Sequence, residues 1–276
     1  MKRAGIAALG VCLICATGGT AAFAGPPLIT DDAGTVELGK LEIELNGSYS
    51  HDSSTSSSFD GEYFNWISGK AEKTELEAKI TTGLWKNLAV SLTIPYTVDE
   101  RVKENDQVIG TTDGFGDMAL DIKYNFLQLG DFSFTVKPTL IMPTGKYSAG
   151  LSEGRWQYGG TMIATKSFDE GRYAIHANVK YEHHDYRTDE AKEGNRRDLY
   201  TGSIAAEAEL FKGFVVGADF GVGNTQDKTT KTLSAYALGG ARYEITENLG
   251  VHAGMKFGLT TPEDDFSVLY GIVLKF

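Results

Sequence analysis

The feature of this sequence that most constrains its fold is an alternation of apolar and polar residues that restarts after each of a series of turns. In residues 41–49 the apolar positions are Leu41, Ile43, Leu45 and Tyr49, with polar residues between them. A period of two places alternate side chains on opposite faces of a β-strand. The alternation recurs in segments 75–84, 88–96, 118–126, 132–142, 156–164, 173–181, 200–210, 214–222, 233–243, 249–259 and 266–276. The sequence predicts about twelve strands, each near the length that a tilted membrane strand needs.

The first 24 residues have the character of a secretory signal peptide. Lys2 and Arg3 precede an apolar run, which ends in a small-residue cleavage motif at residues 22–24. We expect residues 1–24 to be the signal peptide. Residues 25–276 are predicted to form one outer-membrane β-barrel domain with a short N-terminal periplasmic segment.

Composition and charge exclude several classes of protein. Both cysteines, Cys12 and Cys15, lie in the predicted signal peptide, so the mature chain has no thiol for disulfides, catalysis or metal binding. The formal net charge is −11, and loss of the signal peptide makes it more negative, which argues against a nucleic-acid partner. After the signal peptide no apolar run reaches the roughly 18 residues of a membrane helix.

The connections between the predicted strands alternate in length. The short ones lie at residues 86–87, 128–131, 168–171, 211–213 and 246–248, and the longer ones at 51–73, 99–116, 144–155, 183–198, 223–231 and 261–265. Short turns on one side and longer loops on the other are typical of an all-β, antiparallel up-and-down barrel with both termini on the turn side. The Ser-rich stretch that starts at His51 is predicted to be a solvated loop.

Three features favour a transmembrane barrel over a soluble β-sandwich, which would show the same alternation. Aromatic residues gather near both ends of the predicted strands, as at two membrane interfaces. A sandwich gives no reason for the asymmetry in loop length. The chain also ends on Phe276 within an alternating strand, which is similar to the terminal signal read by the barrel assembly machinery of the bacterial (Gram-negative) outer membrane. Outer-membrane lipid and that machinery are therefore expected partners.

A closed barrel directs the polar face of each strand into the lumen. We expect this face to line a narrow aqueous pore, because about twelve strands enclose more space than side chains fill in an eight-stranded barrel. The two signs of charge are both present, so the lumen is not a filter of a single charge. The predicted lumen-lining residues are Glu42, Glu44, Glu75, Glu77, Lys79, Asp121, Lys123, Lys137, His176, Lys180, Glu207, Glu209, Asp219, Arg242, His252 and Lys256.

Some of the polar residues also resemble parts of enzyme or metal sites. The pairs Glu75/Glu77 and Glu207/Glu209 have a carboxylate spacing of about 7 Å, near that of glycosidases, but lumen charges explain them better. His176 with Asn178 invites comparison with outer-membrane phospholipases, although no serine partner is evident. The stretch 183–185 offers too few ligands for a metal site. We therefore predict no catalytic residues, no metal and no cofactor.

Three motifs resemble a known family. They are PLITDDAGTVELGKLEIE at residues 27–44, GFGDMALDIKY at 114–124 and LIMPTGKY at 140–147. They resemble the family called "Putative MetA-pathway of phenol degradation", whose members are outer-membrane transporter-like proteins. The resemblance implies a barrel associated with uptake of small, often aromatic compounds, and it brings no defined binding residues. Asp31 and Asp32 in the first motif either form a turn before the first strand or act at the periplasmic mouth, where they could form a short plug.

The sequence thus predicts a porin-like outer-membrane channel for small solutes, with small aromatic or hydrophobic compounds as candidate cargo. Transport would be passive or weakly facilitated diffusion. Two alternatives stay open: an outer-membrane barrel enzyme, and a structural barrel that does not conduct.

Overall fold

The computed structural model describes residues 25–59 and 64–276. The predicted signal peptide lies outside the described residues, as do residues 60–63 of the predicted loop 51–73. Among the described residues no helix is long and apolar enough to cross a membrane.

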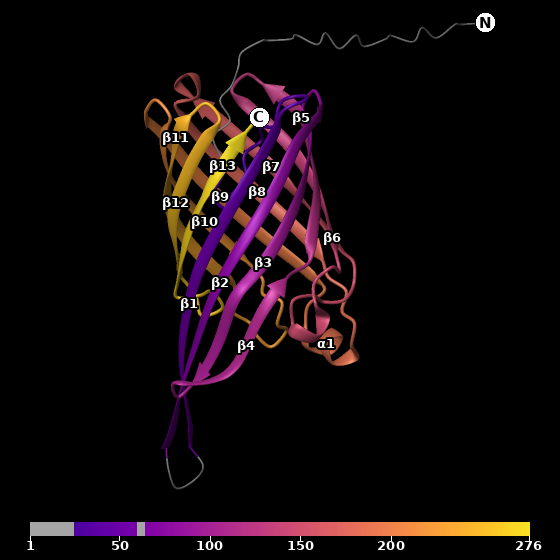
Figure 1. The fold of residues 1–276 in the computed structure, drawn as a ribbon, viewed down its shortest axis with the longest axis vertical. Coiled ribbons are helices and arrows are strands. Elements are labelled where there is room, and N and C mark those ends of the chain that lie inside the picture. Colours follow the sequence, from indigo (N-terminus) through magenta and orange to yellow (C-terminus); the bar gives the residue numbers. More distant parts are fainter. Residues whose placement is uncertain (1–24, 60–63) are drawn as a thin grey trace, which may run out of the picture.

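The chain forms an antiparallel barrel of twelve strands, with one further strand outside the ring (Figure 1). Each ring strand pairs with its neighbours in the chain, and β3 pairs with both β2 and β5. This confirms the predicted fold class. The strands are β1 (Leu41–Phe59), β2 (Phe64–Trp85), β3 (Leu88–Glu104), β4 (Gln107–Phe115), β5 (Met118–Leu129), β6 (Phe132–Met142), β7 (Gln157–Phe168), β8 (Tyr173–His183), β9 (Asp198–Phe211), β10 (Phe214–Gly223), β11 (Ser234–Thr246), β12 (Leu249–Gly258) and β13 (Phe266–Lys275).

Strand β13 closes the ring by pairing with β1. The register places Leu45 opposite Ile272 and Tyr49 opposite Val268. At the end of the ladder the backbone N–H of Phe276 donates to the carbonyl of Leu41 at 2.8 Å, and the Leu41 N–H donates back at 3.1 Å. The chain therefore ends inside a hydrogen-bonded strand, and the barrel has no open edge at this seam.

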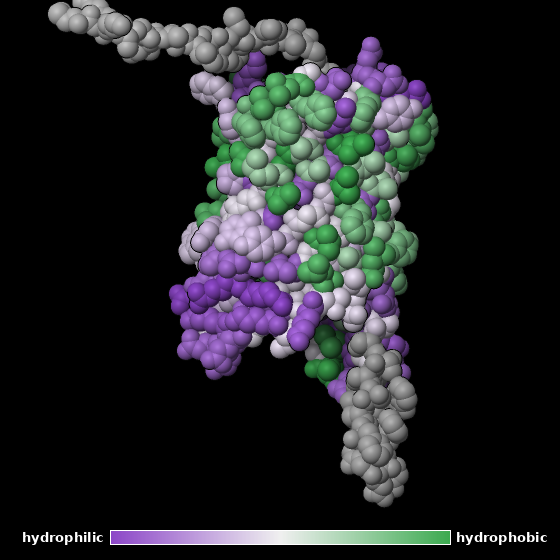
Figure 2. Space-filling model, turned by 180° about the vertical axis from the view of Figure 1, so that it is seen from behind, coloured by the Kyte–Doolittle hydropathy of each residue, from purple (hydrophilic) through white to green (hydrophobic). Residues whose placement is uncertain are grey.

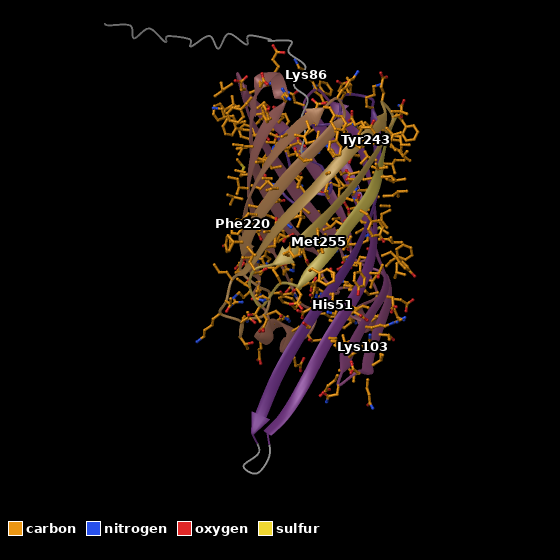
Figure 3. The ribbon with its side chains drawn as sticks, turned by 90° about the vertical axis from the view of Figure 1, so that its left-hand side faces the viewer. His51, Lys86, Lys103, Phe220, Tyr243 and Met255 are labelled. Carbon is orange, nitrogen blue, oxygen red and sulfur yellow. The ribbon has the colours of Figure 1, made fainter. Side chains whose placement is uncertain are left out.

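The two faces of the wall differ as the alternation predicts. Along β8, Ile175 and Val179 are exposed on the outside, whereas His176 and Asn178 between them are buried. Figure 2 shows hydrophobic residues over the barrel wall and hydrophilic residues at both ends. In Figure 3 Phe220, one of many large apolar residues with an exposed side chain, lies at the outer edge of the wall. Such an apolar outer belt around a polar interior is the arrangement of a barrel in lipid.

The C-terminal end of the chain lies at the end of the barrel that carries the tight turns (Figure 1). Lys86, in the turn between β2 and β3, marks this turn end in Figure 3. The loop end carries the longer connections. Among them are the short 3-10 helix η1 (Tyr147–Ala149) and the helix α1 (Asp189–Gly194), whereas η2 (Asp169–Gly171) forms a tight turn.

Two segments predicted as loops continue as strands beyond the barrel. β1 and β2 stay paired from the wall out to Phe59 and Phe64, and β4, within the predicted loop 99–116, pairs with the outer half of β3. The prediction that these two segments are loops was wrong. Main-chain hydrogen bonds extend these hairpins, and no apolar alternation marks them in the sequence.

The loops at the mouth are held together by one arginine. The guanidinium of Arg196 donates to the carbonyl of Thr225 at 2.9 Å and to that of Thr230 at 2.8 Å, which joins the β8–β9 connection to the β10–β11 loop. The fully buried Tyr186 donates its O–H to the carbonyl of Arg196 at 2.6 Å. This hydrogen-bonded network gives the loop end a defined structure.

Residues 25–36 lie inside the barrel, and we call them the lumen segment. They contact side chains from β5 to β7 and from β9 to β12, far from the segment in sequence. The chain returns to the turn end, where Leu38 forms a parallel bridge with Gly83 before β1 begins. The sequence predicts a periplasmic segment at this place. The segment lies in the lumen and not in the periplasm, because the polar wall offers partners for its backbone and carboxylate groups.

Candidate functional site in the barrel lumen

The apolar start of the lumen segment packs against small residues of the wall. Gly240 and Gly254 face Pro27, and a Cβ at Gly254 would lie 2.9 Å from Pro27. Leu28 packs into a buried cluster with Tyr236 and Leu238. The two glycines thus make room for the proline ring, and β11 and β12 receive the segment.

Asp219 of β10 holds the turn that follows. Its Oδ2 accepts hydrogen bonds from the backbone N–H groups of Ile29 at 2.8 Å and Thr30 at 2.7 Å. Its Oδ1 accepts from the Thr30 hydroxyl at 2.7 Å. The Thr30 Oγ1 also lies 2.7 Å from Oγ of Ser203 on β9. A carboxylate that accepts several hydrogen bonds binds this backbone more strongly than a neutral acceptor would.

Asp31 joins the lumen segment to the opposite wall. Its Oδ1 lies 2.7 Å from Nζ of Lys123 on β5, and its Oδ2 lies 2.6 Å from Nζ of Lys137 on β6. Asp32 is 3.8 Å from the same Lys123. The sequence left two roles open for Asp31 and Asp32: a turn before the first strand, or a role at the periplasmic mouth or as a short plug. In the structure both residues lie among the lumen residues, in a segment that crosses the barrel.

Ala33 completes the attachment through its backbone. Its N–H donates to Oγ1 of Thr165 at 2.9 Å. Its carbonyl accepts from Nδ2 of Asn125 at 2.8 Å and from the Thr135 hydroxyl at 2.6 Å. Each of these wall residues lies at a polar position of the alternation. The sequence pattern did not indicate that Ala33 would be its hydrogen-bond partner.

The lumen segment lines two cavities inside the barrel. The loop-side cavity has a volume of about 470 Å³ and extends along β1 to β3 and β13, from Glu44 to Ser48 and from Glu75 to Lys79. The turn-side cavity has a volume of about 540 Å³ and reaches the β9–β10 turn at Lys212. Asp31, Glu44, Lys79, Asp121, Lys137 and His252 line both cavities. Volumes in this range suit small molecules.

The predicted lumen residues occupy different parts of this arrangement. Those that line one or both cavities are Glu42, Glu44, Glu75, Glu77, Lys79, Asp121, Lys123, Lys137, Glu209, Arg242 and His252. The others bind within the wall, to the lumen segment or to the loops. Asp219 holds Thr30, Lys180 pairs with Glu182 at 2.8 Å, and Lys256 pairs with Glu263 at 2.8 Å.

His176 and Glu207 belong to a buried chain of hydrogen bonds. His176 has 0% exposure, with Nδ1 2.9 Å from Oγ1 of Thr165 and Nε2 3.2 Å from Glu207. Arg242 lies 3.2 Å from the other oxygen of Glu207. A hydroxyl, an imidazole and a carboxylate in this order have the connectivity of a catalytic triad. However, Thr165 also accepts the Ala33 N–H, and none of Thr165, His176 and Glu207 lines either cavity.

A second chain of hydrogen bonds begins at His252 and runs from strand to strand around the wall. Its Nε2 lies 3.0 Å from Oδ1 of Asn46, and Nδ2 of Asn46 donates to Glu77 at 3.2 Å. The ring reaches Asn46 on β1 from β12 because Gly271, on the intervening β13, has no side chain, and a Cβ there would lie 2.5 Å from His252 Nε2. The chain therefore links His252 to Glu77 across four neighbouring strands.

No metal centre is present among the described residues, since no group of three or more His, Cys, Asp or Glu side chains is placed to hold an ion. His183, from the stretch weighed as a metal site, instead lies 2.9 Å from Asp198.

Solved structures show the class of fold. The COG4313 outer membrane channel from Pseudomonas putida F1 is 14% identical, with a TM-score of 0.68 over 89% of this chain and 98% of its own. The KdgM porin is 8% identical, with a TM-score of 0.55 over 85% and 99%. The NanC porin is 12% identical, with a TM-score of 0.53 over 85% and 100%. The chain thus has the closed twelve-strand barrel fold of outer-membrane channel proteins.

Residues 45–276 match the family described as "Putative MetA-pathway of phenol degradation", and the chain belongs to that family. This confirms the resemblance to the family, and the motifs at 114–124 and 140–147 lie within the matched region, whereas the motif at 27–44 precedes it. The matched region begins within β1, so the lumen segment lies ahead of it. Curated proteins gave no match.

Proposed function

We propose that this protein is a channel of the bacterial outer membrane that passes small solutes by passive or weakly facilitated diffusion. Small aromatic or hydrophobic compounds are the proposed cargo. The observation that carries the proposal is the pair of cavities within a closed barrel, both lined by a segment that the wall holds through side chains and not by a packed core.

The wall and the lumen support transport in different ways. An apolar outer belt fits lipid, and the polar lumen fits water and solute. Besides the packing of Pro27 and Leu28, the segment is held by hydrogen bonds and ion pairs of wall side chains, so its movement leaves the main-chain ladders of the barrel intact. The solved structure with the TM-score of 0.68 bears the name of an outer membrane channel, in agreement with this function.

The proposed cargo rests on the family and on the lining of the loop-side cavity. The family description names phenol degradation, which requires entry of small aromatic compounds. Pro27, Leu28, Ile29, Pro95 and Leu269 line the loop-side cavity together with its charged residues. A lining that is partly apolar and partly polar is typical of sites for small organic molecules.

A barrel enzyme is the second candidate, because the Thr165 hydroxyl lies beside His176. The lumen segment covers this threonine through the Ala33 N–H, and Thr165 lines neither cavity. The test is labelling of the folded protein with an acyl-type reagent such as a fluorophosphonate. Channel function predicts no adduct at Thr165, and a stoichiometric adduct would support the enzyme.

The test of the channel is single-channel recording of the purified, refolded mature protein in a planar bilayer, with phenol and benzoate added to either side. Discrete conductance steps that either solute interrupts are expected. A heat-modifiable barrel that inserts but never conducts would contradict the proposal and favour a structural barrel.

A further inference from the structure

We infer that the loop-side cavity binds small organic cations, such as an aromatic amine in its ammonium form, with Glu77 as the anionic group. This inference rests on the proposed channel and names a class of solute within it. Four observations carry it: the fixed position of Glu77, the balance of charge in the cavity, the buried unpartnered nitrogen of His252, and the apolar side chains opposite.

Glu77 is held in place by neutral groups. Its Oε1 accepts the 3.2 Å hydrogen bond from Asn46, whose Oδ1 in turn lies 3.0 Å from His252 Nε2. Because the Asn46 amide donates to Glu77 and accepts from His252, the imidazole carries its proton on Nε2. The carboxylate is therefore oriented without a cation that neutralises it.

The charges that line the loop-side cavity are unbalanced. Five carboxylates, of Asp31, Glu44, Glu75, Glu77 and Asp121, stand against two lysines, Lys79 and Lys137. Three of the carboxylates form ion pairs: Glu44 with Lys79 and Glu75 with Lys73, both at 2.7 Å, and Asp31 with Lys137 at 2.6 Å.

Glu77 and Asp121 form no ion pair with any described residue. Asp121 accepts a hydrogen bond from the Thr139 hydroxyl at 2.5 Å, and Glu77 accepts that of Asn46. A partly enclosed space lined by excess negative charge raises the local concentration of cations. The turn-side cavity differs, because Lys123, Lys212, Arg242 and Lys275 also line it and offset most of its carboxylates.

His252 supplies an independent sign of a site. The residue is 6% exposed and lines both cavities, yet its Nδ1 has no hydrogen-bond partner among the described residues. With the proton on Nε2, Nδ1 is an acceptor. A buried acceptor that lacks a partner is costly, and a water in the cavity beside a bound solute would satisfy it.

Apolar side chains around the same cavity fit the body of such a cation. Ile29 of the lumen segment is 49% exposed although it lies within the barrel, and it lines this cavity together with Leu269. Pro95 is the register partner of Glu77 and also lines the cavity. An ammonium group at Glu77 would thus place an attached ring against apolar surface, whereas a carboxylate would meet like charge.

The test measures binding and conduction separately. Binding of benzylammonium, phenylacetate and benzyl alcohol to the refolded mature protein in neutral detergent is measured by titration calorimetry, and the three solutes are then used as blockers in planar bilayers. The variants are Glu77→Gln and, as a matched loss of one charge in the turn-side cavity, Glu244→Gln. Heat modifiability shows that each variant has folded.

The inference predicts that benzylammonium binds at least about tenfold more tightly than phenylacetate, and that Glu77→Gln removes most of this preference while Glu244→Gln keeps it. Equal binding of the two ions, or a preference that survives Glu77→Gln, would overturn it. Conductance steps without cation preference would leave the channel standing and remove only the cation site. Cation binding without conductance would keep the site and contradict the channel.

Discussion

The carboxylate of Asp31 lies 2.6 Å from the ammonium group of Lys137, and this contact joins the lumen segment to β6, four strands from the Asp219 strand β10 in the order of pairing. Lys123 binds the second oxygen of the same carboxylate at 2.7 Å. All three side chains are at least three-quarters buried, so water screens the attraction only in part. These ion pairs and the Asp219 hydrogen bonds are therefore expected to decide how often the segment leaves its position.

Replacing Asp31 by Asn should loosen the lumen segment. The change leaves two partly buried lysines without their anion, and loss of one partner from a buried ion pair costs about 3–5 kcal/mol at most. Single-channel recording should show a larger mean conductance or longer open periods. The matched control is Asp106→Asn, which breaks a 3.0 Å pair with Lys70 whose aspartate is 83% exposed. Equal recordings for Asp31→Asn and the native protein would contradict the role of this contact.

A covalent link should have the opposite effect. The hydroxyl oxygens of Thr30 and Ser203 are 2.7 Å apart, so the double variant Thr30→Cys, Ser203→Cys brings two thiols within reach of a disulfide. Both natural cysteines lie within residues 1–24, so the predicted mature chain has no competing thiol. Oxidation should lower the conductance and reduction should restore it. Conductance that is the same in both redox states would show that solutes pass a stationary segment.

Replacing Gly271 by Ala should weaken closure of the barrel. The added Cβ would lie 2.5 Å from both His252 Nε2 and the backbone oxygen of Leu45. Overpacking of this kind costs roughly 1–3 kcal/mol. The temperature at which the protein loses its heat-modifiable mobility should fall. Gly239→Ala is the control, because a Cβ there meets nothing within 4 Å. An unchanged temperature for Gly271→Ala would argue against the packing of His252 across β13.

Replacing Phe276 by Ser should impair assembly into the membrane and leave secretion intact. The backbone bonds of Phe276 to Leu41 can persist, so the variant tests the aromatic side chain as a signal for the barrel assembly machinery. Its level in the outer membrane should fall while the periplasmic form accumulates. Phe211→Ser, which removes another exposed aromatic at the turn end, is the control. Native outer-membrane levels of the Phe276 variant would contradict this reading.

The loops at the mouth should lose protection as the pH falls. Burial lowers the pKa of His184, whose two ring nitrogens lack hydrogen-bond partners, although Glu182 and Glu153 oppose the shift. In open loops the pKa would return to about 6.5. The open form then binds more protons, so the stability of the closed loops is present above about pH 6.5 and declines below it.

Hydrogen exchange at the Tyr186 and Arg196 amides, corrected for the intrinsic effect of pH, measures this change. Protection should decrease between about pH 7 and pH 5 in the native protein. His184→Phe should abolish the decrease because it removes the titrating group. Equal pH dependence in both proteins would place the responsible group elsewhere.

The sequence predicted the parts of the fold that alternation determines. Leu41, Ile43 and Leu45 mark a strand because one face meets lipid and the other meets the lumen, and the same pattern marks each wall strand. It failed for β4, whose residues are exposed on nearly every side, because no environment there selects apolar residues.

The sequence predicted which residues face the lumen, but it did not predict which residues bind each other there. Glu77 and Asp219 stand at polar positions, but their partners Asn46 and Thr30 are distant in sequence and depend on the register between strands and on the lumen segment. The segment itself has no periodicity, because its backbone is held by wall side chains. Its one signal was the pair Asp31 and Asp32 in a stretch that alternation did not explain.

The measurement that tests the central claim most directly compares the single-channel conductance of the native mature protein with that of a variant lacking residues 27–34. Discrete steps are expected in the native protein and clearly larger steps in the variant, because the two cavities would then join into one pore. No conductance in either protein, with both barrels folded and inserted, would contradict it.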